Sequence, residues 1–219
     1  MITTAKLIST DGEKITLLPK DDIRRELERM EVDTIEIRLR DGREISPEQR
    51  RAIFATVNDI SIWSGHEPEY IRAHLMWEHC RNTEQEPFSL SDCSVTQAHD
   101  FLDYLIDFVL RHGVPLKEPL ALRTDDIGRY MYHCIEHGKC AVCGQPGEIH
   151  HVDTVGANGG NRKLIIHAGL LAVCLCRIHH TEAHMNEKKF FEANHIEPIR
   201  LDNYLCRIHN LKAKDNTYE

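Results

Sequence analysis

The chain lacks any long apolar stretch: nowhere in its 219 residues do about 18 apolar residues follow one another. Its first residues, MITTAKLISTDGEK, also lack the basic and apolar segments of a secretory signal peptide. A helix that crosses a bilayer needs about 20 apolar residues. The sequence therefore excludes a helical membrane protein, and we expect a cytoplasmic protein without a membrane partner.

A positive net charge is absent too. The chain carries 27 Lys and Arg against 35 Asp and Glu, which gives a formal net charge of −8. Such an acidic chain is a poor general binder of polyanions, so any contact with nucleic acid has to come from a local patch. Internal repeats and low-complexity segments are missing as well, which leaves an ordinary globular protein.

Cysteine and histidine, in contrast, are abundant, with 8 and 15 residues. In a reducing compartment, metal binding explains clustered cysteines better than disulfides do. The residues after Tyr130 hold six of the cysteines and ten of the histidines, and their Lys+Arg and Asp+Glu balance at 10 each; the residues up to Tyr130 hold 17 against 25. We therefore predict two domains, 1–125 and 126–219, with the metal chemistry in the second.

The fold class that these patterns favour is α+β, with a small sheet and then helices in the first domain. Residues 35–45 alternate apolar and charged side chains around an Asp41-Gly42 turn, which predicts a strand pair. Ser46 and Ser94 each precede a capping-box Gln by three residues, and Gly65 and Gly113 end the two helices. In all we predict helices over about residues 21–30, 46–65, 68–81, 94–113 and 124–137.

A zinc site is predicted by two pairs of ligands. Cys140 and Cys143 form a CxxC knuckle, and Cys176 and His179 repeat the same two-residue gap further along the chain. Four such ligands make a tetrahedral structural zinc site. Cys174 is a rival ligand, because residues two apart on a strand share a face, so a four-cysteine site that includes Cys174 and Cys176 stays open.

A second metal site is predicted by four further histidines. His150 and His151 are adjacent in a segment that should be extended, so their imidazoles point to opposite faces, and one can bind metal while the other faces a substrate. His180 and His184 lie four apart on an expected helix and share a face. The sequence HTEAH lacks the Glu directly after the first His that a metalloprotease needs.

The order CxxC, EIHHVD, CxxHH and a His four residues on resembles the HNH nucleases, whose ββα-metal core surrounds one catalytic divalent ion. The resemblance covers about residues 134–200. Within the HNH nucleases, the chain resembles the phage proteins described as putative HNHc nucleases. It implies a C-terminal ββα-metal domain with a structural zinc knuckle. It also implies host bacterial cytoplasm as the location if the gene belongs to a phage.

The resemblance implies a role for each histidine. His150, His180 and His184 would hold Mg²⁺ or Mn²⁺, and His151 would be the general base that activates water. Cleavage of DNA would leave 5′-phosphate and 3′-hydroxyl ends. The middle residue of the motif, which braces the base, would be Asn161, with Asn158 and His167 as alternatives. Nearby cations that could grip phosphates are Arg162, Lys163 and Arg177.

The first domain, residues 1–125, resembles the Orf (NinB-type) recombination mediators of phages. The similarity lies in the runs SPEQRRAIFATVNDISIWSGHEPEYIRAHL and SLSDCSVTQAHDFLDYLIDF. It implies a homodimer that binds single-stranded DNA and single-strand-binding protein. Arg38 and Arg40 are DNA contacts if folding gathers them with other arginines, although a salt-bridged surface explains them equally well. Trp63 and Trp77 could stack on bases, but the helical pattern favours the core for both.

Together these features predict a metal-dependent DNA endonuclease and recombination mediator that acts on single-stranded or branched DNA. The alternative is a non-catalytic, zinc-stabilised protein that binds DNA and single-strand-binding protein. His151 separates the two, because a purely structural platform needs the zinc ligands but has no use for a general base.

Overall fold

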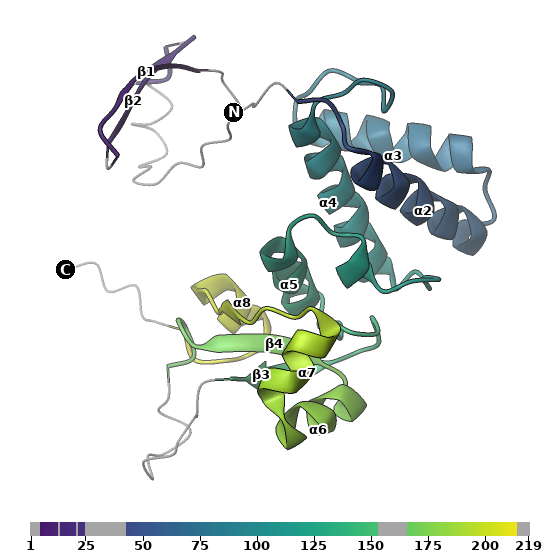
Figure 1. The fold of residues 1–219 in the computed structure, drawn as a ribbon, viewed down its shortest axis with the longest axis vertical. Helices are drawn as coiled ribbons and strands as arrows, with labels where there is room; N and C mark the ends of the chain where they lie inside the picture. The colour runs from purple at the N-terminus through teal and green to yellow at the C-terminus, as the bar shows by residue number, and fades with distance from the viewer. Residues whose placement is uncertain (1–4, 13, 21, 25–42, 153–165, 214–219) are drawn as a thin grey trace.

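The structure, a computed structural model, describes residues 5–12, 14–20, 22–24, 43–152 and 166–213 (Figure 1). Seven α-helices and two small antiparallel sheets lie within these residues, which confirms the α+β class. The strand pair expected at 35–45 and the helix expected at 21–30 fall largely outside the described residues. None of the described helices is long and apolar enough to cross a membrane.

The first sheet is a hairpin that the sequence analysis did not predict. Strand β1 (Ala5–Thr10) pairs antiparallel with β2 (Ile15–Pro19), and an Asp11-Gly12 turn joins them. The Asp11 carboxylate accepts a hydrogen bond from the Lys14 backbone at 2.7 Å, and Gly12 has a φ of 95°, a conformation that favours glycine. This Asp-Gly turn is of the same kind as the Asp41-Gly42 turn from which we predict a strand pair.

Three helices follow, and their ends confirm the predicted capping. Helix α2 (Pro47–Ser64) begins at a capping box of Ser46 and Gln49 and ends at Gly65, whose φ is 76°. Helix α3 (Pro68–Asn82) begins with a proline in its first turn. Helix α4 (Val95–His112) repeats the capping box with Ser94 and Gln97 and ends at Gly113. The two capping boxes satisfy backbone N–H groups at the starts of α2 and α4, and the glycine N–H groups bond carbonyls at their ends.

Helix α4 forms the core of this helical part, as its wide apolar stripe predicts. Leu102 and Leu105 on α4 are fully buried, and α2 and α3 both contact this helix. The expectation that Trp63 and Trp77 lie in the core is wrong, because their exposed fractions are 45% and 52%. Both sit on the outer side of helices whose inner faces are already filled by smaller side chains.

A short connection joins α4 to the rest of the protein. It contains a 3₁₀ turn (Leu120–Leu122) and Arg123, whose buried guanidinium contacts the Asp59 carboxylate of α2 at 2.8 Å. Helix α5 (Ile127–Glu136) follows, capped by the Asp126 side chain. It contacts both α4 and the second sheet, so α5 lies between the two parts of the protein (Figure 1). The domain boundary at 125/126 stays a prediction.

The second sheet has the order β3-β4-β5 and is antiparallel. Its strands are β3 (Glu148–His151), β4 (Leu171–Leu175) and β5 (Ile199–Arg200). In the register, His150 lies opposite Val173 and His151 opposite Ala172. Three short helices accompany the sheet: α6 (Arg177–Met185), α7 (Glu187–Asn194) and α8 (Asn203–Ile208). Helix α6 starts directly after β4, which places its first turn beside the sheet.

Candidate metal centres and active site

The CxxC knuckle is a tight turn between α5 and β3. The Cys140 backbone N–H donates to the Gln145 carbonyl at 2.8 Å, and Gly144, with a φ of 68°, donates to the Cys140 carbonyl at 2.8 Å. The neighbouring Ala141 ties the knuckle to the sheet, because its N–H donates to Cys174 of β4 and its carbonyl accepts from Tyr130 of α5. The knuckle is thus held from both sides.

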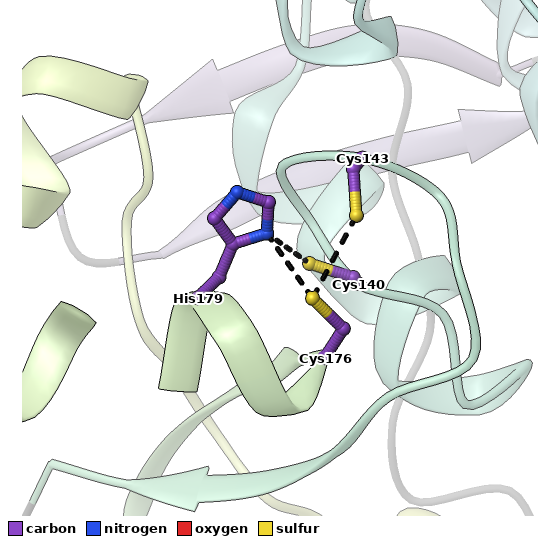
Figure 2. A group of neighbouring side chains, drawn as sticks. All are labelled: Cys140, Cys143, Cys176 and His179. Carbon is purple, nitrogen blue, oxygen red and sulfur yellow. Dashed lines mark hydrogen bonds between the residues drawn. The ribbon is translucent and has the colours of Figure 1, made fainter. Parts of the chain in front are cut away.

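The knuckle meets the start of α6 and completes a Cys₃His group (Figure 2). Cys176 is the N-cap of α6 and His179 stands in its first turn, so both point back to the knuckle. His179 Nδ1 lies 3.3 Å from Cys140 Sγ and 3.2 Å from Cys176 Sγ, and the sulfurs of Cys143 and Cys176 are 3.8 Å apart. Ligands of a tetrahedral zinc ion are separated by roughly 3.5–3.8 Å. The residues therefore fit zinc.

Cys174, the rival ligand, does not belong to this group. Its sulfur packs against Gly147, where an added Cβ would come within 2.8 Å of it. The added Cβ would also lie 3.0 Å from the Leu175 backbone, so glycine at position 147 permits the close approach to β4. The thiol is buried, and burial raises the pKa of Cys174 to about 12, which keeps it neutral.

The second candidate metal group consists of three imidazoles. His150 of β3 faces His180 and His184 of α6, with ring centroids 4.6 and 4.8 Å away, and one ligand atom of each lies within 4.8 Å of the others. His180 and His184 stack on one face of α6, as their spacing predicts. His180 Nδ1 also contacts the Glu148 carboxylate at 2.8 Å, which orients the ring.

His150 is the most constrained member of this histidine group. Its side chain is 1% exposed, Nε2 contacts the Glu187 carboxylate at 2.8 Å, and Nδ1 is buried with no hydrogen-bond partner among the described residues. A buried nitrogen without a partner costs free energy unless something binds it. Burial lowers the pKa of His150, and this outweighs the opposing effect of Glu187. A neutral imidazole beside two others fits a divalent cation.

His151 points to the other face of β3, as strand alternation predicts. It is half-buried, and its Nε2 lies 2.8 Å from Nδ1 of His167. His167 was one of three options for the residue that braces the base. Asn161, the preferred option, and Asn158 lie outside the described residues, so that choice stays a prediction.

Of the expected phosphate contacts, only Arg177 lies within the described residues. It is the first residue of α6 and is exposed. The others lie outside them: Arg38, Arg40, Arg162 and Lys163.

A protein family matches most of the chain in sequence. The sequence pattern of the family described as Putative HNHc nuclease matches residues 20–212. The chain belongs to this family. The match includes the N-terminal helices, whereas the resemblance read from the motifs covered only about residues 134–200. No curated protein and no solved structure matches the chain.

Membership of the Putative HNHc nuclease family indicates nuclease activity, a DNA substrate and a divalent metal. The acidic partners of the histidine group were not predicted from the sequence. Glu187 comes at the start of α7 and Glu148 at the start of β3, and each orients one imidazole of the histidine group. Glu148 directly precedes Ile149 and His150, so a search for a carboxylate on the same strand face would have found it; Glu187 had no such signal.

Proposed function

We propose that the protein is a metal-dependent DNA endonuclease that hydrolyses phosphodiester bonds, with His151 as general base. His150, His180 and His184 hold the catalytic ion, and the Cys₃His group holds a structural zinc. The observation that carries this proposal is the buried His150 Nδ1, which has no hydrogen-bond partner among the described residues and stands beside two helical imidazoles.

His151 suits the role of base through its contact with His167. If His151 Nε2–H donates to His167 Nδ1, the lone pair of the neutral His151 ring is on Nδ1, where it can take a proton from water. The opposite tautomer would place the proton on Nδ1 and leave no lone pair there. In the first arrangement, His167 would hold the tautomer that the reaction needs, in the way a second residue orients a catalytic histidine.

The divalent ion, when bound, would offset the charge on the scissile phosphate and stabilise the departing oxygen. The choice of ion follows from the donors. Three imidazoles suit Mn²⁺ better than Mg²⁺, which prefers oxygen ligands and near-ideal octahedral geometry. We therefore expect Mn²⁺ to support faster cleavage than Mg²⁺ at equal concentration.

The test compares cleavage by wild type and His151→Ala on single-stranded, forked, four-way and duplex DNA with each metal. We expect a loss of at least about 100-fold for His151→Ala, because a positioned base contributes that much. His74→Ala on α3 is the control, since this His lies 47% exposed on α3, and it should cut like wild type. Equal cutting by both variants would exclude His151 as the base, and a wild type inactive on every substrate would support the non-catalytic alternative.

The proposal also includes a role in recombination. We infer that single-stranded or branched DNA is the substrate and that the helical part contributes to its binding. The exposed Trp63 and Trp77 rings support this, because exposed aromatic rings are the surfaces on which bases stack. Substitution of both by Ala should weaken single-stranded DNA binding about tenfold or more in a fluorescence titration. Binding to single-strand-binding protein and homodimer formation are tested by pull-down and by light scattering.

A further inference from the structure

A third group of metal-type ligands lies away from both sites, where α4 meets α5. One ligand atom of each member lies within 4.8 Å of the others, and their side chains are between 10% and 24% exposed. The group, called the α4–α5 cluster below, consists of Asp107 from α4 and His133, Glu136 and His137 from α5.

The four donor atoms alternate between nitrogen and oxygen around a closed ring. Asp107 Oδ1 lies 2.6 Å from His137 Nε2 and 3.6 Å from His133 Nδ1. Glu136 Oε2 lies 3.4 Å from His133 Nδ1 and 4.0 Å from His137 Nε2. These separations bracket the roughly 3.4 Å between neighbouring ligands of a tetrahedral ion with bonds of about 2.1 Å. Two His and two carboxylates are ligands that zinc accepts.

Hydrogen bonds alone satisfy these four donor atoms poorly. Each imidazole nitrogen can carry one proton, but each faces two carboxylate oxygens, so a proton serves one of them well and leaves the other weakly bound. A cation at the centre binds all four atoms at once. Both rings lie on the same side of α5, and His133 Nδ1 and His137 Nε2 both face Asp107 Oδ1.

In three of the four ligand side chains, the nitrogen or oxygen that does not face the centre of the cluster contacts another residue. His133 Nε2 contacts Asp103 Oδ1 at 3.0 Å, and Asp103 is held in turn by Arg129 at 2.9 Å. Arg111 contacts the second oxygen of Asp107 at 2.8 Å, and the Tyr204 hydroxyl donates to the second oxygen of Glu136 at 3.1 Å. A carboxylate on the far nitrogen of a ligating His is the usual outer shell of a metal site.

We propose that the α4–α5 cluster binds a Zn²⁺ ion that fixes α5 to α4. The ion joins the N-terminal helices to the helix that carries the zinc knuckle, because α5 also contacts β4 and the knuckle through Tyr130. Its role is structural, and it stands apart from the nuclease chemistry.

The test is the zinc content of the full-length protein, equilibrated with Zn²⁺ and freed of loose metal by gel filtration. The double variant His180→Ala with His184→Ala removes the histidine group and serves as background. In this background we expect two zinc ions per chain, one in the Cys₃His group and one in the cluster. A content of one ion per chain would overturn the proposal.

Single substitutions in the same background assign the second ion. His137→Ala and Glu136→Gln should each lose one zinc equivalent, and Glu136→Gln keeps the size of the side chain in case His137→Ala does not fold. The matched control is His99→Ala, which removes a His–Asp contact of 2.8 Å on α4. It should keep both ions. Two ions in every variant, with circular dichroism like that of the background, would place the second zinc elsewhere and overturn the assignment.

Discussion

The helical part, α2 to α4, and the part from the knuckle to α7 are stabilised in different ways. In the first, apolar side chains such as Leu102 and Leu105 are fully buried between long capped helices. In the second, strands β3 and β4 have only four and five residues, and three Cys and four His converge in two groups. Both parts bury apolar side chains, including Val173 and Leu175 of β4, but these two groups of metal-type ligands lie in the second part only. We therefore expect the second part to depend on bound metal more than the first does.

We expect the largest difference between the two parts when a zinc ligand is removed. Cys140→Ser should abolish zinc binding and unfold the part from the knuckle to α7, because structural zinc contributes about 10–16 kcal/mol in apparent binding free energy in small zinc domains. The helices α2 to α4 should stay folded. Amide hydrogen exchange measures both parts in one experiment.

The control for Cys140→Ser is Cys93→Ser, a buried thiol of the helical part outside every metal group. It should cost at most about 1–3 kcal/mol, the penalty for a poorly satisfied hydroxyl. If α6 amides stay protected in Cys140→Ser, the second part does not depend on zinc and the comparison fails.

A smaller effect is expected from the ion pair that joins α2 to the connection before α5. Arg123 and Asp59 are 4% and 3% exposed and contact each other at 2.8 Å. Arg123→Met should lower the free energy of unfolding by about 3–5 kcal/mol, because Asp59 is left buried and unpaired. Chemical denaturation measures this.

The double substitution Arg123→Met with Asp59→Leu tests the reason for that loss. It should recover most of the stability, since a buried ion pair can be replaced by apolar groups of similar size. A double variant as unstable as Arg123→Met would show that the arginine acts through packing rather than charge.

The smallest effect concerns pH. The hydrogen bond that His99 Nδ1–H donates to the Asp125 carboxylate raises the pKa of His99 above its ordinary value. Burial alone would raise the pKa of Asp125, but hydrogen bonds from His99 and Gln49 lower it. The His99 contribution is present below its unfolded pKa of about 6.5 and is lost as pH rises through the folded value; the Asp125 contribution is lost as pH falls below about 4.

The pair should therefore stabilise the protein most between about pH 4 and 6.5, by about 1 kcal/mol or less because both side chains are about one-third exposed. Denaturation of wild type and His99→Ala at a series of pH values measures this contribution. A difference between the two proteins that does not change with pH would show that His99 contributes packing only.

Local patterns were the parts of the fold that the sequence could predict. A capping box needs only Ser46 and Gln49, three residues apart, and the i, i+4 spacing of His180 and His184 depends only on the helix. The zinc ligands are similar, because a two-residue gap constrains the turn whatever surrounds it. The predicted Cys₃His group is accordingly brought together in the structure, with Cys174 left out.

Contacts between distant segments could not be predicted in this way. Trp63 and Trp77 have helical neighbours typical of a core, and only the packing of α2 and α3 on α4 shows that these positions face outward. Glu187 of α7 contacts His150 of strand β3, 37 residues away in the sequence. The α4–α5 cluster depends on the crossing of two helices, so no spacing in the sequence indicates that Asp107 meets His137.

The register of β3 against β4 has a consequence for engineering. Adjacent residues of a strand face opposite sides, so a shift by one position moves every side chain to the other face. Position 150 pairs with Val173 and faces the imidazoles of α6, whereas position 151 faces His167. Inserting a single residue just before Glu148 would turn both imidazoles to the opposite face of the strand and would place Ile149 where His150 now faces α6. An insertion at that point should thus abolish the proposed nuclease activity, and a compensating deletion after His151 would not restore it.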